Sequence, residues 1–259
     1  MDHIAIASHV LPVTQLAGRP GKISAVQPTW MGNNTLIFLN DISGFHNPWI
    51  ATIDRMEGSE ALSVITRPLL KRGLDQDFAD PSWWLGVSNL AILDSNSILC
   101  CATKEGNHVL YAVTVEGECL EIKSPYVTIL RLRTIGGRCV AFLGATNHEE
   151  KDLIYCTFDK SFKPSFVTVG KSSIIMDNGV SAMMDFISMP RYIAVEVHPA
   201  VSESRTVGVL FHPPTNPKYQ GPVNERPCAI VSVHGGPTFT AYSGLSMMKQ
   251  YFTSRGWAW

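Results

Sequence analysis

The residues best suited to chemistry form one short segment, His234-Gly235-Gly236-Pro237. It follows an apolar run, Ala229 to Val233, whose β-branched residues and flanking turn residues predict a buried strand. The two glycines allow a sharp turn and a close approach of the backbone to a ligand, because no Cβ is in the way. A strand followed by His-Gly-Gly is typical of α/β-hydrolases, in which a backbone N–H after the strand supplies half of an oxyanion hole. The alternative interpretation is a tight turn without chemistry.

The overall composition excludes several other classes of function. The chain has 259 residues, of which 45% are hydrophobic and 17% charged, and its net charge of −1 gives no electrostatic reason to expect a nucleic acid or an anionic membrane as partner. Six cysteines without a CxxC pair predict buried, reduced thiols, as in cytosolic proteins. The N-terminus has no signal-peptide pattern, and no run reaches the roughly 18 apolar residues of a membrane span. We therefore expect a cytoplasmic chain without a membrane or nucleic-acid partner.

Metal and cofactor sites are not indicated either. The eight histidines are dispersed without the spacing of a zinc site. No glycine-rich phosphate-binding loop occurs, and GxGxxG is absent. The expectation is therefore a protein that uses no metal and no cofactor.

The first two thirds of the chain contain a repeated pattern of paired apolar strands. Ile37, Leu99 and Ala141 occupy equivalent places in it and lie 62 and 42 residues apart, whereas propeller repeats are about 40–50 residues long. An insertion between blades, from Arg67 to Trp84, explains the longer interval. Such units cannot bury their faces alone, so they must stack on one another. The pattern predicts three to three and a half blades of a partial β-propeller over residues 1–180, with a β-sandwich as the alternative.

The remaining residues, 181–259, predict a different architecture. The expected elements are strands Tyr192–Val197 and Arg205–Phe211, a proline-rich loop, the strand Ala229–Val233, a helix over about 242–254 with Gly256 as its C-terminal cap, and a strand opening at Trp257. An alternation of strand, turn, helix and strand indicates an α/β architecture. The predicted fold class is therefore mixed β and α/β, a partial propeller followed by the N-terminal part of an α/β-hydrolase domain.

Several motifs together resemble one known family. They are Gln76-Asp77-Phe78-Ala79-Asp80-Pro81-Ser82-Trp83-Trp84-Leu85-Gly86, His212-Pro213-Pro214-Thr215-Asn216-Pro217, Val233-His234-Gly235-Gly236-Pro237-Thr238 and Thr253-Ser254-Arg255-Gly256-Trp257-Ala258. This set is similar to the prolyl oligopeptidase family of serine peptidases, in its branch of acylaminoacyl-peptidases and dipeptidyl-aminopeptidase-like enzymes. The resemblance implies an N-terminal propeller that restricts access to a Ser-Asp-His triad in a C-terminal α/β-hydrolase domain, and short peptides as substrates.

Carried over residue by residue, the resemblance gives this chain one catalytic group. The backbone N–H of Gly236 is implied as an oxyanion donor, with His234 shaping the loop and Gly235 and Pro237 as its neighbours. The nucleophile belongs in a G-x-S-x-G elbow, which occurs nowhere in the chain; Gly244-Leu245-Ser246-Met247-Met248 lacks the final glycine. We therefore expect none of the triad here, and a truncated piece of a longer peptidase that is inactive alone and whose substrate in the complete enzyme is a peptide.

Two other functions remain open at this point. One is a non-catalytic, propeller-based module that binds proteins, which the missing nucleophile favours. The other is an esterase of the α/β-hydrolase fold, against which a propeller argues. The pair Trp83-Trp84 is expected to pack between blades, because aromatic pairs bury much area, with the wall of a substrate entrance as the alternative.

Overall fold

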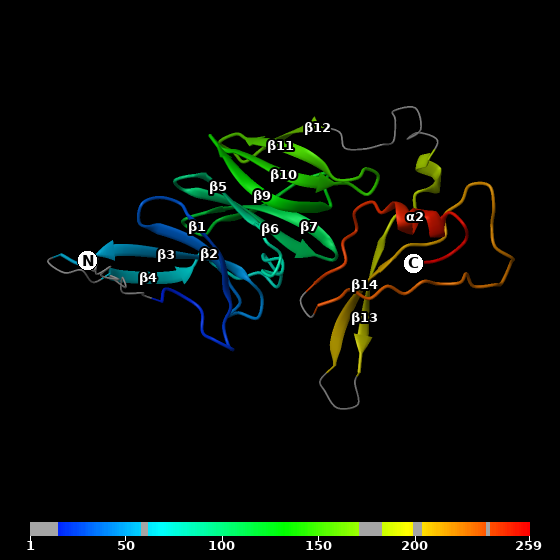
Figure 1. Cartoon of the computed structure of the whole chain (residues 1–259), viewed down its shortest axis with the longest axis horizontal. Helices are drawn as coiled ribbons and strands as arrows, with labels where there is room; N and C mark the ends of the chain where they lie inside the picture. Colours follow the sequence, from blue (N-terminus) through cyan, green and yellow to red (C-terminus); the bar gives the residue numbers. More distant parts are fainter. Residues whose placement is uncertain (1–14, 58–61, 171–182, 199–203, 237–238) are drawn as a thin grey trace, which may run out of the picture.

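The computed structural model describes residues 15–57, 62–170, 183–198, 204–236 and 239–259. Most of this described chain folds into three antiparallel sheets of four strands each (Figure 1). The first sheet contains β1 (Ala25–Trp30), β2 (Thr35–Asn40), β3 (Asn47–Arg55) and β4 (Leu62–Pro68). The second contains β5 (Leu90–Asp94), β6 (Ser97–Lys104), β7 (Asn107–Thr114) and β8 (Cys119–Ile122). The third contains β9 (Thr128–Gly136), β10 (Cys139–Ala145), β11 (Asp152–Phe158) and β12 (Pro164–Gly170).

The three sheets are repeats of one unit. Within each, the strands follow one another in the order of the sequence, as a series of hairpins. Ile37, Leu99 and Ala141 are each the third residue of the second strand of their sheet, in β2, β6 and β10. The equivalence predicted for these three residues is therefore confirmed, and so are the central strands of each unit.

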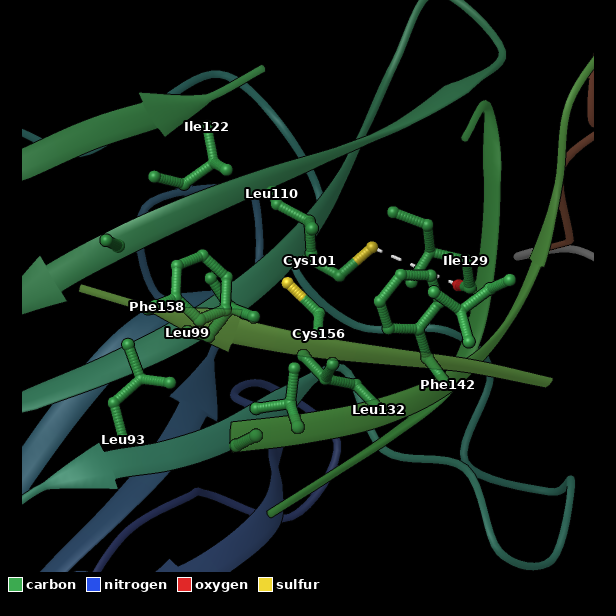
Figure 2. Close-up of a cluster of buried hydrophobic side chains, with 14 residues drawn as sticks. Leu93, Leu99, Cys101, Leu110, Ile122, Ile129, Leu132, Phe142, Cys156 and Phe158 are labelled. Atoms are coloured by element: carbon green, nitrogen blue, oxygen red, sulfur yellow. Dashed lines mark hydrogen bonds between the residues drawn. The ribbon is translucent and has the colours of Figure 1, made fainter. Parts of the chain in front are cut away.

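The hydrophobic core lies between sheets stacked in series. Ile37 and Ile98 belong to a cluster between the first and second sheets, and Leu99 and Phe142 to a cluster between the second and third, which Figure 2 shows. Ile98 and Leu99 are sequence neighbours in β6, and successive side chains of a strand point to opposite faces. The second sheet is thus covered on both faces. This arrangement excludes the two-sheet sandwich and matches consecutive propeller blades, although the described sheets do not close a ring.

The cysteines are free thiols that differ in their exposure. Cys100, Cys101 and Cys156 are buried in the sheet cores, whereas Cys119 and Cys228 are exposed and Cys139 is half-buried. Burial raises the pKa of the Cys156 thiol to about 12 and raises that of Cys101 as well. The three buried thiols are therefore protonated at neutral pH, whereas the prediction that the cysteines are buried is wrong for Cys119 and Cys228.

The insertion between the first two sheets starts slightly later than predicted. Strand β4 continues through Arg67 to Pro68, so the insertion begins at Leu69. It is anchored by Leu69 and Phe78, which are buried in the core between the first and second sheets. Its later part, from Asp80 to Trp84, extends to the neighbourhood of the C-terminal residues.

The C-terminal part contains one hairpin and short helical elements among its described residues. Strands β13 (Arg191–Val197) and β14 (Arg205–Phe211) pair antiparallel, which confirms both predicted strands. Figure 1 shows this hairpin projecting from the sheets, beside the short helix α2 (Met247–Thr253). A single 3₁₀ turn, η1, covers Met184–Phe186. The predicted boundary between residues 180 and 181 lies outside the described part of the chain. No helix among the described residues has the length and apolar character needed to cross a membrane.

The predicted strand Ala229–Val233 is wrong. Only Ala229 forms a bridge, parallel to Ala258, and Val231 and Val233 are more than four-fifths exposed. The β-branched sequence favours an extended backbone, but a buried parallel strand also needs neighbours along it and cover on both faces. In the described chain this segment is bonded only to the short C-terminal stretch, through Ile230 N–H to the Ala258 carbonyl at 2.9 Å.

The predicted helix over 242–254 is confirmed only in its second half. Helix α2 begins at Met247, because the backbone N–H groups of Ser243 and Leu245 donate to carbonyls of Gly106, in the turn between β6 and β7, and of Thr146, just after β10, instead of forming a helical turn. Its predicted C-terminal cap is present. Gly256 has φ +88°, and Trp257 N–H donates to the Phe252 carbonyl at 3.2 Å, the bond that a glycine cap of this kind makes.

Candidate functional site

The two glycines of the His-Gly-Gly loop differ in what their positions require. Gly236 has φ +68°, and a Cβ added there would lie 3.1 Å from Cζ2 of Trp83. A Cβ on Gly235 would meet nothing within 4 Å. Gly236 is therefore the residue whose missing side chain is needed both for the backbone conformation and for the close approach to Trp83. The neighbouring Pro237 lies outside the described residues.

His234 is exposed, and its ring lies 6.1 Å from that of Phe239, tilted by 55°. Among the described residues, the His234 side chain contacts Phe239 through its ring. That His234 shapes the loop through a hydrogen bond therefore remains a prediction. The contact connects His234 to the segment that follows the loop.

The prediction that Trp83 and Trp84 pack between blades is wrong. Their side chains are 54% and 45% exposed, at the end of the insertion rather than in a sheet core. Trp83 lies against Gly236, and Trp84 makes an edge-to-face contact with Phe239 at a centroid distance of 5.0 Å. The insertion carries both rings beyond the sheets, so they contact the residues around the His-Gly-Gly loop instead.

A hydrogen bond between distant parts of the sequence lies beside these rings. The hydroxyl of Tyr242 donates to Oδ1 of Asp80 at 2.9 Å, and Nδ2 of Asn89 donates to Oδ2 of the same carboxylate at 3.0 Å. Burial raises the pKa of Asp80, but the His108 ring and the donated hydrogen bonds outweigh it, so that pKa is lowered. Burial and the neighbouring Asp80 charge raise the pKa of Tyr242. Both groups therefore keep the forms that this bond requires at neutral pH.

His108 completes the cluster from the second sheet. Its side chain is fully buried, and its Nδ1 accepts the N–H of Ile129 at 2.8 Å, which leaves the proton on Nε2. Nε2 lies 3.8 Å from Asp80 Oδ1, and the ring lies 4.6 Å from that of Tyr242. In the sequence this residue was one of several dispersed histidines. The structure places its ring against that of Tyr242, and no metal site includes it among the residues that the structure describes.

The segment after the loop is fixed to the sheets by its backbone as well. Ser243 N–H donates to the Gly106 carbonyl at 3.1 Å, and Leu245 N–H donates to the Thr146 carbonyl at 3.0 Å. Between them, Gly244 approaches the third sheet so closely that an added Cβ would lie 2.6 Å from Oγ1 of Thr128. These contacts explain why residues 243–245 lie outside the helix.

Two cavities flank the cluster. One of about 470 Å³ and one of about 390 Å³ both have Asp80, Phe239 and Tyr242 in their walls. Trp84 and Arg131 line the larger cavity, so that its wall combines aromatic and cationic groups. Among the described residues, no group of three or more His, Cys, Asp or Glu side chains has the arrangement of a metal site. The described site offers backbone donors and a shaped, aromatic-lined space beside them.

Sequence reasoning found the loop but missed Asp80, His108, Phe239 and Tyr242. None of them has a spacing that singles it out, since Asp80 and Tyr242 are 162 residues apart. An aspartate before a proline and a tyrosine before a serine are common in folded proteins. Only the folded chain brings these residues together.

The solved structures to which this chain is similar are peptidases and hydrolases. No protein-family model and no curated protein matches the chain. Among solved structures, a puromycin-hydrolyzing peptidase of Mycobacterium tuberculosis matches 92% of this chain with 25% identity and a TM-score of 0.73, and a puromycin hydrolase matches 95% with 23% identity and a TM-score of 0.74. The dipeptidyl peptidase 4 of Porphyromonas gingivalis matches 86% with 9% identity and a TM-score of 0.53, which is a likeness of fold alone.

The matches extend over only part of the other proteins. The chain spans 33% of the M. tuberculosis peptidase, 34% of the puromycin hydrolase and 28% of the dipeptidyl peptidase. The resemblance to the prolyl oligopeptidase family of peptidases is thereby confirmed, with this chain corresponding to about a third of such a protein.

Proposed function

We propose that this chain is the propeller and oxyanion-loop part of a serine peptidase that hydrolyses short peptides and releases aminoacyl or acylaminoacyl groups. The observation that carries the proposal is the 25% identity with the puromycin-hydrolyzing peptidase over 92% of the chain. In this proposal residues 181–259 are the start of the α/β-hydrolase domain.

The proposed mechanism assigns one step to a group of this chain. A serine outside these 259 residues attacks the peptide carbonyl and forms an acyl-enzyme, which water hydrolyses. The N–H of Gly236 donates to the carbonyl oxygen as it becomes an oxyanion, together with the N–H of the residue after the serine. Loss of one such donor lowers kcat by about 10²–10³. The sheets and the aromatic rings of the insertion limit which substrates reach the loop.

The experiment is labelling with a serine-directed fluorophosphonate probe, followed by assays with puromycin and with peptide amides. The purified 259-residue chain should not be labelled. A longer product of the same gene that contains a G-x-S-x-G sequence should be labelled stoichiometrically and should hydrolyse the amides. Labelling of the 259-residue chain would contradict the assignment of the nucleophile to a later segment.

The same experiment decides between the remaining alternatives. A longer product without a G-x-S-x-G sequence and without labelling would refute the peptidase and support a protein-binding propeller. A product that is labelled but hydrolyses only carboxylic esters would support the esterase. Hydrolysis of both amides and esters is expected of a serine peptidase, since amides are the more demanding substrates.

A further inference from the structure

The propeller part of the chain touches the candidate oxyanion loop at a definite place. We propose that Asp80 and Tyr242 are positioning residues, whose hydrogen bond holds the segment after His234–Gly236 on the insertion and thereby fixes the N–H of Gly236. The inference rests on the proposed function for its catalytic meaning. The structural claim, that this hydrogen bond fixes the position of Gly236, can be tested independently of the proposed function.

The Asp80 end of the bond is rigid. Asp80 is 9% exposed, and Asn89 binds it twice, with Nδ2 donating to the carboxylate and Oδ1 accepting the Asp80 N–H at 3.1 Å. Asn89 is in turn held by Gln27, whose Oε1 accepts its N–H at 2.7 Å and whose Nε2 donates to its Oδ1 at 2.8 Å. The acceptor offered to Tyr242 is therefore fixed to the first and second sheets. A charged acceptor in a buried site also makes this a strong hydrogen bond.

From Tyr242 a series of ring contacts leads back to the loop. The Tyr242 ring lies 5.8 Å from Phe239, and the Phe239 ring lies 5.0 Å from Trp84 and 6.1 Å from His234. Trp83, next to Trp84, lies against Gly236. Asp80 and both tryptophans belong to one short stretch of the insertion. Gly236 on one side and Phe239 and Tyr242 on the other are thus in contact with the same short stretch of the insertion.

The loop has little else to hold it among the described residues. His234, Gly235 and Gly236 are all exposed, and Val233 before them is 83% exposed. A segment with few buried contacts opens at low cost. Removing the Tyr242 hydroxyl should therefore release the loop from Trp83 without unfolding the sheets.

The test is Tyr242→Phe in the 259-residue chain, which keeps the ring on His108 and deletes only the donor. The Gly236 signal in ¹H–¹⁵N spectra should shift toward its position in the variant Trp83→Leu. That variant is the reference for Gly236 without an indole ring beside it. The amides of Ser243 and Leu245, which are bonded to the sheets, should exchange at least about tenfold faster. Tyr219→Phe is the matched control, since Tyr219 is 76% exposed, and it should leave all these signals unchanged.

Other outcomes overturn the inference. If Tyr242→Phe accelerates exchange at Ser243 and Leu245 but leaves the Gly236 signals in place, the bond is structural and does not position the loop. If neither the exchange rates nor the Gly236 signals change, the hydrogen bond does not stabilise this segment, and the inference is refuted. Should Tyr242→Phe unfold the chain, Asp80→Asn provides the second variant: it keeps an acceptor oxygen but removes the charge, and an unaltered Gly236 signal would refute the proposal.

Activity separates this inference from the proposed function. In a longer product that the fluorophosphonate labels, Tyr242→Phe should lower kcat about tenfold or more with KM within about twofold, because it affects a group that acts in the transition state. A raised KM with unchanged kcat would refute positioning of the donor. A product that is never labelled would refute the peptidase and leave the spectroscopic result standing.

Discussion

The contrast between the two adjacent glycines of the loop gives the sharpest functional prediction. Gly236→Ala places a Cβ at φ +68°, where an L-residue costs about 1–2 kcal/mol, and 3.1 Å from the Trp83 ring, which must move by a few tenths of an ångström. The Trp83 ring can shift away from the new Cβ, but the positive φ is relieved only if the loop backbone turns, which displaces the N–H. Gly235→Ala adds the same atom in open space and has neither problem.

The assay is steady-state hydrolysis of an aminoacyl amide by the longer, fluorophosphonate-reactive product. Gly236→Ala should lower kcat by about 10²-fold, the typical effect of losing one oxyanion donor, with KM within about twofold. Gly235→Ala should keep kcat within about threefold of the parent. Equal losses in both variants, or an unchanged kcat in Gly236→Ala, would refute the assignment of the donor.

Two further predictions concern stability. Leu99→Ala, at a fully buried position between the second and third sheets, should lower the free energy of unfolding by about 2–5 kcal/mol in urea titrations followed by circular dichroism. The control Leu120→Ala, at a 49% exposed position, should change it by less than about 0.5 kcal/mol. Equal effects of the two variants would contradict the stacked core. Burial and the charge of Lys249 lower the pKa of His212 from 6.5 to about 4, so the folded chain takes up this proton less readily than the unfolded chain. The free energy of unfolding is therefore unaffected by His212 above pH 6.5 and falls by up to about 3 kcal/mol as the pH is lowered toward 4. Hydrogen exchange of the α2 amides should accelerate over that range, and a flat profile would contradict it; Lys249→Met, which removes the opposing charge, should make the loss smaller.

The propeller part was predictable where its strands are buried. The second and third strands of each sheet carry most of its buried apolar side chains, and their repeat at equivalent residues, such as Ile37 and Leu99, identified the unit. The outer strands carry less of this signal; β4 is exposed along nearly all its length and β12 along most of it. Their pairing is dictated by the neighbouring strand rather than by their own side chains.

The C-terminal errors have a common physical cause. Val231 and Val233 have high β-propensity, but propensity measures how well a side chain fits a covered sheet, and the described chain supplies no such cover. The start of α2 was misplaced because Ser243 and Leu245 bond to the sheets. In the site itself, the glycines were recognisable from the sequence alone. The residues that gather around them, such as Asp80 and Tyr242, were not, since contacts over such separations leave no local pattern.

The meander order of the sheets has a consequence for how the chain folds. Every pairing within the three sheets joins strands that are adjacent in the sequence, so each hairpin closes a short loop at a low entropic cost. Sheets with such local contacts form faster than β-structures with distant pairings, and during synthesis each can form once its own four strands have emerged. The bond from Tyr242 to Asp80, spanning 162 residues, must wait until both partners are made. The propeller sheets thus become a finished surface first, and the segment that follows the His-Gly-Gly loop docks onto it last.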